Sequence, residues 1–523
     1  MWLPLSAVAL LLATPLAMLI VRLARPRFAY FWLIAAFGGL LAWPLVLLSH
    51  PDQPLQIPLV TWKPEELLPV SPALLVDHIS WPFALALASL ALGVILTDVA
   101  RAWEADWSVW AGSLAFTALG LFAVLAGNPL TLLLAWAAID LIELVILLLE
   151  HVQSAVRERL ALNFSSRVAG IVLVILAGIL ARSSGSSFSF ETISPRINVL
   201  LLLAAGLRLG VVPLHLPFLS ELPLRRGLGT LLRLVPTAAS LVLLSRTAAA
   251  GVPENLAPYL LVFSALAALY GSISWATADH ELDGRQFWIL GMAAFVVASS
   301  VRGQPSASLA WGIALLLSGG LLFFFSARHR SLLVLPLLGL AGFSCLPFTP
   351  AWEGVRMYTP FTPLMFAFLI SQGIFMAGYL RHALRPGLSL TGVERWVWAI
   401  YPAGLALLPL TQVLITWWGR APEAVSGEIF PPLTASWPGL ASLALAGLFI
   451  FLGRRGGSIP RSLVTAFRRV FSFGWLYRLL WSVYHSLARW IGWINLILEG
   501  EGGILWTLLL LALLFSLLAQ RGL

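Results

Sequence analysis

Charged side chains interrupt long apolar segments of this chain at Asp140, Glu143, Arg208 and Arg233. A charge at the centre of a bilayer costs about 2.5–3.5 kcal/mol even on the lenient insertion scale. Such residues usually face the interior of a helix bundle and mark a path for ions, protons or a polar substrate. We therefore treat these four residues as the first candidates for a functional site.

Asp140 and Glu143 are three residues apart in one apolar segment, so on a helix they share a face. Two carboxylates this close repel each other when both are ionised, so we expect one of them to carry a proton at neutral pH. That arrangement suits proton exchange. The alternative is that arginines on another helix compensate both carboxylates, with no role in transport.

Two glycines and two prolines within residues 206–217 predict an interrupted helix around Arg208. His215 follows Arg208 by about two turns, and histidine is the natural proton carrier near neutral pH. His215 is therefore either a proton relay or a hydrogen-bonded core residue. Arg233 stands beside Pro236 near the start of the next apolar segment. It either stays at membrane depth or extends to the inner surface.

The composition excludes a soluble globular protein, since 60% of the 523 residues are hydrophobic and only 11% are charged. Segments of the length needed to cross a bilayer recur throughout the chain. We expect an all-α polytopic membrane protein with about sixteen transmembrane helices. They are predicted near 2–21, 29–49, 79–97, 108–126, 130–149, 166–182, 197–219, 227–246, 257–277, 286–301, 306–326, 331–349, 360–380, 396–418, 437–453 and 503–520.

The distribution of arginine predicts a multi-pass protein of the cell inner (plasma) membrane with its N-terminus outside. Residues 454–502 form a long connection in which 462–493 alternates apolar and arginine residues at helical spacing. We expect a lateral amphipathic helix there, either a surface anchor or a brace against helices of this chain or a partner. The single cysteine, Cys345, excludes a disulfide framework and a cysteine-based metal site.

The charged segments and several shorter motifs occur in the order found in one family. The chain resembles the antiporter-like membrane subunits of the respiratory complex I, Mrp cation/proton antiporter and membrane-bound hydrogenase superfamily. The resemblance covers most of the chain, and each motif is weak alone. The segments that carry it are 138–144, 208–216, 231–233, 76–80, 281–282, 342–347 and 371–375.

This resemblance implies roles for three of the charged residues. Asp140 stands at the position of the family's fifth-span glutamate, Arg208 at that of its seventh-span lysine, and Arg233 at a polar eighth-span position. We expect Arg208 to form a direct or water-bridged charge pair with Asp140 within the membrane, as a fixed counter-charge and not a relay, because arginine is not deprotonated in proteins. Residues 318–320 lack the family's histidine and lysine, and spans from 286 to 453 hold almost no ionisable residue. The proton path is therefore expected to be degenerate.

The resemblance further implies two inverted five-helix repeats. We expect N-terminal helices in 1–100, a first repeat with the charges in 101–250, a second, apolar repeat in 251–420, and the C-terminal helix, lateral helix and last span in 421–523.

The function implied is an antiporter-like subunit of a proton- or cation-translocating or redox-coupled, NADH-quinone oxidoreductase-like complex. The chain would not be catalytic alone. It would hold no cofactor or metal, because it has no flavin, haem or iron–sulfur motif. Its partners would be other membrane subunits and the lipid bilayer; the net charge of +9 comes from loop arginines and does not indicate nucleic acid. Two other interpretations remain, a non-translocating structural subunit and a membrane enzyme acting on an anionic lipid-linked substrate.

Overall fold

The computed structural model describes residues 2–59, 70–101, 106–150, 154–216, 225–388, 393–419 and 433–454, together with short pieces between 482 and 516. The chain divides into two compact units, Met1–Val464 and Thr465–Leu523. The helices, the hairpin and the candidate site described below all lie in the first unit.

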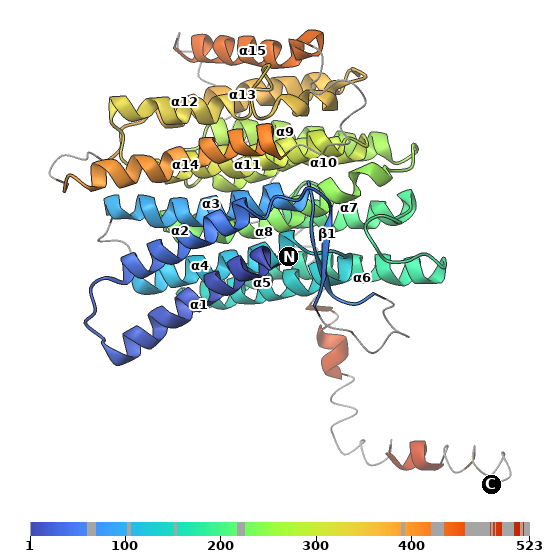
Figure 1. The fold of residues 1–523 in the computed structure, drawn as a ribbon. Helices are drawn as coiled ribbons and strands as arrows, with labels where there is room; N and C mark the ends of the chain where they lie inside the picture. Colours follow the sequence, from blue (N-terminus) through green and yellow to red (C-terminus); the bar gives the residue numbers. More distant parts are fainter. Residues whose placement is uncertain are drawn as a thin grey trace. The chain divides into compact units, whose positions relative to one another are not determined.

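Fifteen α-helices occur in the described part of the first unit, packed side by side in layers (Figure 1). They are α1 Leu3–Ala24, α2 Phe31–Leu47, α3 Ser80–Thr97, α4 Trp107–Val124, α5 Pro129–Glu150, α6 Ser154–Ser183, α7 Pro195–Leu209, α8 Arg226–Thr247, α9 Ala257–Ala276, α10 Arg285–Val301, α11 Pro305–Phe324, α12 Val334–Ala341, α13 Met365–Ala383, α14 Val397–Trp418 and α15 Trp437–Arg454.

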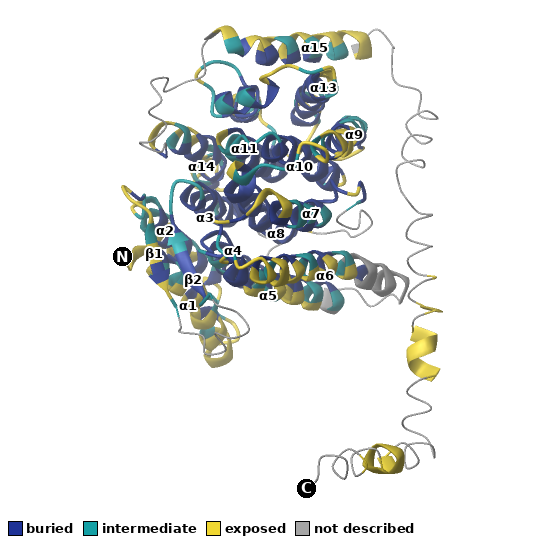
Figure 2. Ribbon diagram, turned by 90° about the vertical axis from the view of Figure 1, so that its right-hand side faces the viewer, coloured by how far each residue is buried: buried dark blue, intermediate teal, exposed yellow. Residues whose placement is uncertain are grey.

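Ten helices in the described residues are long and apolar enough to cross a membrane, and α2 and α10 are shorter apolar helices. The segments that contain α3 and α8 are almost wholly buried, whereas α1, α6 and α15 expose most of their apolar residues (Figure 2). Helices that are apolar on all sides and buried in the bundle cannot be recognised by amphipathicity. The buried centre of the bundle consists of α3, α8, α10 and α11, and of these α8 contributes to the candidate site described below.

A two-stranded antiparallel hairpin lies in the connection between α2 and α3. Strand β1, Leu55–Pro58, pairs with β2, Ala73–Val76, so that Leu55 is opposite Val76. The sequence predicted no strand in this proline-rich connection. The described structure is thus all-α apart from this hairpin.

The predicted spans up to residue 453 each overlap one helix, but two of them are too long. α12 has only 8 residues, against a predicted span of 331–349. The helix ends at Ala341, and in the turns that follow it Cys345 and Phe348 adopt positive φ angles of 56° and 64°. The lateral helix predicted at 462–493 and the last span predicted at 503–520 lie largely outside the described residues.

α7 also ends early, at Leu209, against a predicted span of 197–219. Gly210 follows it with φ 77°, a left-handed conformation that glycine adopts at little cost. The Val211 N–H donates to the Gly206 carbonyl at 2.8 Å, which satisfies an acceptor at the helix end. The predicted interruption around Arg208 is confirmed, with the arginine in the last turn of the helix.

Candidate functional site

Asp140 on α5 and Arg208 on α7 form a two-pronged ion pair. The Arg208 Nη2 donates to Asp140 Oδ1 at 2.8 Å, and Nη1 donates to Oδ2. The same guanidinium lies over the Trp136 ring, 4.2 Å from its centroid. The predicted pairing of Asp140 with Arg208 is confirmed, and it has the planar geometry that arginine favours with carboxylates.

Glu143 is held by two further arginines. Arg167 on α6 reaches both of its oxygens, with Nη2 3.2 Å from Oε1, and Arg233 on α8 donates to Oε1 at 3.2 Å. Arg167 also contacts Asp140 Oδ1 at 3.4 Å. We call Asp140, Glu143, Arg167, Arg208 and Arg233 the ion cluster. Its members come from four helices and are only 1–5% exposed.

The sequence left open whether arginines compensate the two carboxylates and whether Arg233 extends to the surface, and these contacts bear on both questions. Each carboxylate lies between two guanidiniums, so arginines on other helices do compensate both of them. Arg233 turns toward Glu143 and is 4% exposed, so it does not extend to the surface. Buried charges paired in this way avoid most of the desolvation penalty that an isolated charge would carry.

Arg167 is the member of the ion cluster that sequence reasoning missed. The predicted sixth span began at residue 166, which made Arg167 look like a flanking residue. α6 begins at Ser154, so Arg167 lies well inside the helix. The signal for it was electrostatic, since two carboxylates on one helix face require nearby positive charge.

His215 is not brought into the ion cluster by any contact among the described residues. Its Nδ1 lies 2.8 Å from the Pro213 carbonyl, and its buried Nε2 has no hydrogen-bond partner there. The ring is 5% exposed. The relay role of His215 therefore remains a prediction.

A crevice between α5 and α6 gives the ion cluster an opening. It is lined in part by Asp140, Glu143 and Arg167. Its other walls are apolar and consist of Leu144, Leu147, Leu160 and Phe164. Water in this space would contact the two carboxylates, which is the access that proton exchange needs. In the described residues, no group of three or more His, Cys, Asp or Glu could hold a metal ion.

Gly170 sets the distance between α6 and α7 beside Arg208. A Cβ at this position would lie 2.9 Å from Arg208 Cγ and 3.1 Å from the Ala204 carbonyl. The close approach of the two helices therefore requires a residue without a side chain, and it places Arg167 and Arg208 on opposite sides of the same carboxylate.

We expect Gly170→Val to destabilise the protein by about 1–3 kcal/mol, because overpacking displaces Arg208 or separates the helices. Gly447→Val on α15 is the matched control, since nothing lies within 4 Å of a Cβ there. Thermal unfolding in detergent measures both. Equal midpoints for the two variants would contradict the role assigned to Gly170.

Neither a protein-family model nor any curated protein sequence matches the chain. Solved structures do. A chain of the Mrp complex from Dietzia sp. DQ12-45-1b aligns with a TM-score of 0.69 and 14% identity over 99% of this chain and 63% of that one. A chain of the membrane-bound sulfane sulfur reductase, an archaeal respiratory membrane complex, aligns with a TM-score of 0.68 and 15% identity over 98% and 99%.

A chain of respiratory complex I from Thermus thermophilus aligns with a TM-score of 0.60 and 18% identity over 84% of this chain and 99% of that one. This chain shares its fold with these chains of multisubunit membrane complexes. It is a multi-pass membrane protein, and it spans 63% of the length of the Mrp chain. The sequence identities with these structures are too low to assign a function, so the function must be argued from the residues of the candidate site.

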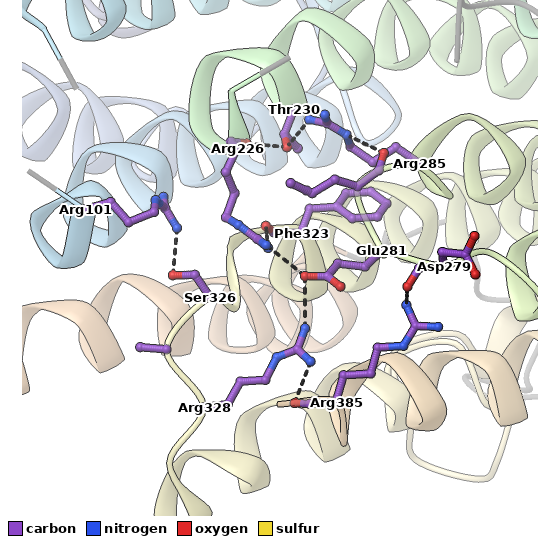
Figure 3. A network of polar contacts seen from close by, with 12 residues as sticks. Arg101, Arg226, Thr230, Asp279, Glu281, Arg285, Phe323, Ser326, Arg328 and Arg385 are labelled. Carbon is purple, nitrogen blue, oxygen red and sulfur yellow. Dashed lines mark hydrogen bonds and ion pairs between the residues drawn. The ribbon is translucent and has the colours of Figure 1, made fainter. Parts of the chain in front are cut away.

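A second charged group lies at one end of the helix bundle (Figure 3). Glu281, in the turn before α10, pairs with Arg226 at 2.8 Å and with Arg328 at 2.9 Å. Arg226 also donates to the Phe323 carbonyl at 2.7 Å. Glu281 is 3% exposed, and its ion pairs tie the start of α8 to the turn before α10 and to the connection after α11.

Burial would raise the pKa of Glu281, but Arg226 and Arg328 outweigh it and hold that pKa at about 2. A carboxylate with a lowered folded-state pKa stabilises the protein above its unfolded pKa, and this stabilisation is lost as pH falls toward the folded value. The window for Glu281 therefore runs from about pH 4.5 down to about pH 2.

Glu281→Gln is expected to lower the free energy of unfolding at pH 7 by on the order of 3 kcal/mol, and so to lower the unfolding midpoint. The difference from the unsubstituted protein should shrink as pH falls from about 4.5 to about 2. Exposed Glu254→Gln serves as the control. Measured midpoints that differ by the same amount at pH 7 and pH 3 would be inconsistent with the ion pairs of Glu281.

Helices α11 to α15 and their connections contain a neutral hydrogen-bond network. Gln372 on α13 donates to the Phe343 and Ser344 carbonyls and accepts from Tyr358 at 3.0 Å and from Ser442 at 2.9 Å. Gln412 donates to Ser318 Oγ at 3.3 Å and to the Gly342 carbonyl at 3.1 Å. These groups satisfy one another, and none of them carries a charge at neutral pH.

Proposed function

We propose that this chain is an antiporter-like membrane subunit of a proton- or cation-translocating or redox-coupled complex, with a degenerate proton path. The observation that carries the proposal is the buried ion cluster inside this fold. Paired charges at membrane depth are expensive to bury and mark functional sites by default. The complex would supply any redox chemistry through other subunits.

In this proposal Asp140 and Glu143 exchange protons, and the arginines act as fixed counter-charges. The crevice between α5 and α6 supports proton exchange by the carboxylates, because it reaches both of them. The permanent charge of arginine supports its role as a fixed counter-charge. His215 is a further proton carrier near neutral pH in this scheme. The neutral network around Gln372 and Gln412 supports a path that is incomplete in the second half.

The second candidate is a structural membrane subunit that moves no ions. The observation favouring it is that three guanidiniums contact the two carboxylates, a geometry sufficient for stability alone. An enzyme acting on an anionic substrate has no comparable support. The first two candidates share partners and differ only in proton flux.

We further propose that the N-terminus lies outside and that residues 101–250 and 251–420 form two inverted repeats. With that orientation the ends of α1, α3 and α9 and the start of α8 lie on the inner side, together with Glu281. The positive-inside rule supports it, because Arg22, Arg25 and Arg27 follow or end α1.

Purification of the chain from its native membrane in mild detergent tests the assignment to a complex. We expect it to copurify with other polytopic membrane subunits in fixed stoichiometry, and to separate from them in a harsh detergent. A chain that is isolated alone in the mildest detergents, in a folded state, would contradict the proposed function in both its forms.

A further inference from the structure

Two histidines from different segments of the chain lie next to each other near the β1–β2 hairpin. His50 follows the end of α2, and His78 lies between β2 and the start of α3. Their ring centroids are 5.9 Å apart, and the two ring planes are inclined at 69°. Both residues are partly exposed, so a small ion can reach them. We call His50 and His78 the histidine pair.

Each ring of the histidine pair has a buried nitrogen without a hydrogen-bond partner among the described residues. In His50 this atom is Nε2, and in His78 it is Nδ1. A buried polar atom that is left unpaired costs about 1–3 kcal/mol, so each such atom in a native protein calls for an explanation. Two of them on neighbouring rings indicate a shared ligand that binds imidazole nitrogen.

The surroundings of His50 hold its ring in the form that binds a metal ion. Burial lowers the pKa of His50, so the ring is neutral at neutral pH. One ring nitrogen bonds to the backbone of Trp418, and because Nε2 has no partner, that nitrogen is Nδ1. The Nδ1–H therefore donates to the Trp418 carbonyl, and Nε2 keeps its lone pair. Histidines that bind metal are almost always oriented by such a bond from their other nitrogen.

Two tryptophans fix the position of the His50 ring. It stacks on Trp418, with centroids 5.3 Å apart and planes inclined at 16°, and it packs nearly perpendicular to Trp81 at 4.7 Å. Trp81 is wholly buried and donates from Nε1 to the Val46 carbonyl at 2.9 Å. The ring of His50 is therefore in place before any ion binds.

A turn built around Asp77 holds His78. The Asp77 Oδ1 accepts from the N–H groups of Ile79 at 3.1 Å and Ser80 at 2.7 Å. The Asp77 Oδ2 accepts from Arg246 at 2.8 Å. These bonds occupy both carboxylate oxygens, so Asp77 does not serve as a further ligand. The histidine pair thus offers two protein ligands, fewer than the three of a catalytic zinc site or the four of a structural one.

We propose that the histidine pair is a binding site for Zn²⁺ or a similar transition-metal ion, held by His50 Nε2 and His78 Nδ1 with water in the remaining positions. Zinc lies 2.0–2.1 Å from a histidine nitrogen, which places the centroids of two ligating rings roughly 5–6 Å apart. The observed separation of 5.9 Å agrees with this geometry. Imidazole is a ligand for zinc, copper and nickel, whereas magnesium and calcium require oxygen ligands.

A bound ion would connect helix ends that are distant in the sequence. His50 brings the end of α2 to the ion, and His78 brings the start of α3. Through the bond from His50 to Trp418, the last residue of α14, the ion would also hold the end of that helix. An ion that binds only the folded protein stabilises it. The site is therefore expected to clamp this end of the bundle when zinc is present.

Zinc titration of the purified full chain in detergent tests the site, with an affinity tag that contains no histidine. We expect calorimetry to show a saturable site with one ion per chain, and the thermal unfolding midpoint to rise at saturating zinc. His50→Phe keeps a ring against Trp418 but removes one ligand, and His78→Ala removes the other. Each should weaken zinc binding by more than about tenfold, since even loss of a group that only orients a ligand costs about 10–100-fold.

His280→Ala is the matched control. His280 is exposed and lies in the connection between α9 and α10, so its loss should leave zinc binding unchanged. The proposal is refuted if the folded, unsubstituted protein shows no saturable zinc binding. It is equally refuted if a folded His50→Phe or His78→Ala protein binds zinc as tightly as the unsubstituted one.

A spectroscopic measurement on the unsubstituted protein decides the question if neither variant folds, as judged by gel filtration. Cu²⁺ also binds imidazole, and its electron paramagnetic resonance spectrum reports the nitrogen atoms that bind it. With one equivalent of Cu²⁺ we expect coupling to two imidazole nitrogens. Coupling to a single nitrogen, or to none, would overturn the assignment of His50 and His78 as a pair of ligands.

Discussion

Asp140→Asn is expected to abolish proton flux through this subunit in vesicles that carry its complex. Asparagine cannot exchange a proton, and Asp140 is the carboxylate that joins Arg208 to Arg167. The flux is followed with a dye that reports the internal pH while the complex turns over. Asp52→Asn, an exposed substitution of the same kind, is the control and should leave the flux unchanged.

Arg208→Lys tests whether residue 208 acts only as a counter-charge to the residues that carry protons. We expect the flux to be intact or increased, because a buried lysine releases its proton much more readily than arginine does. Suppose instead that the unsubstituted complex shows no flux through this subunit, and that Asp140→Asn changes only its stability. The non-translocating structural subunit would then be the correct assignment.

Arg167→Met is expected to destabilise the protein by about 3–5 kcal/mol, the usual effect of removing one partner from a buried ion pair. Arg167 contacts both Glu143 and Asp140, so its loss leaves two buried carboxylates with fewer counter-charges. Methionine keeps most of the side-chain volume, which limits the contribution of a cavity. Unfolding of the purified chain in detergent, followed by circular dichroism, gives the free energy.

Arg182→Met provides the comparison within the same helix. Arg182 is exposed near the end of α6, and an exposed arginine contributes about 0–1 kcal/mol. A difference between the two variants of less than about 1 kcal/mol would mean that Arg167 is not needed to hold the ion cluster together.

The sequence predicted the ion cluster well because charge at membrane depth is rare and costly. Asp140 and Arg208 could be paired from the sequence alone, since each needs a partner and their positions suggested it. Arg167 escaped because helix ends are hard to place in an apolar sequence, and an arginine near a predicted end looks like a surface residue. His215 was grouped with the cluster by its distance along the chain, which does not determine contact in a broken helix.

The errors in helix length have a similar origin. Hydropathy registers apolar residues but not backbone direction, so α7 and α12 were predicted too long. Gly210 ends the first of them through a left-handed turn, which its glycine made foreseeable. Cys345 and Phe348 turn the chain after α12 although neither is glycine, so only the surrounding packing determines those angles. The β1–β2 hairpin was not predicted because its two strands are very short and lie in a connection rich in proline and acidic residues.

The neutral network of Gln372 and Gln412 has an electrical consequence. A charge that enters the ion cluster from one side and leaves by the same side crosses only part of the membrane field. Full passage would change its energy by about 2.3 kcal/mol per 100 mV. If the unsubstituted complex shows no net flux through this subunit, the subunit would instead store displaced charge in proportion to voltage and return it when the voltage falls. Such a subunit behaves as a capacitor within its complex, and its signature is a transient current that integrates to zero over a cycle.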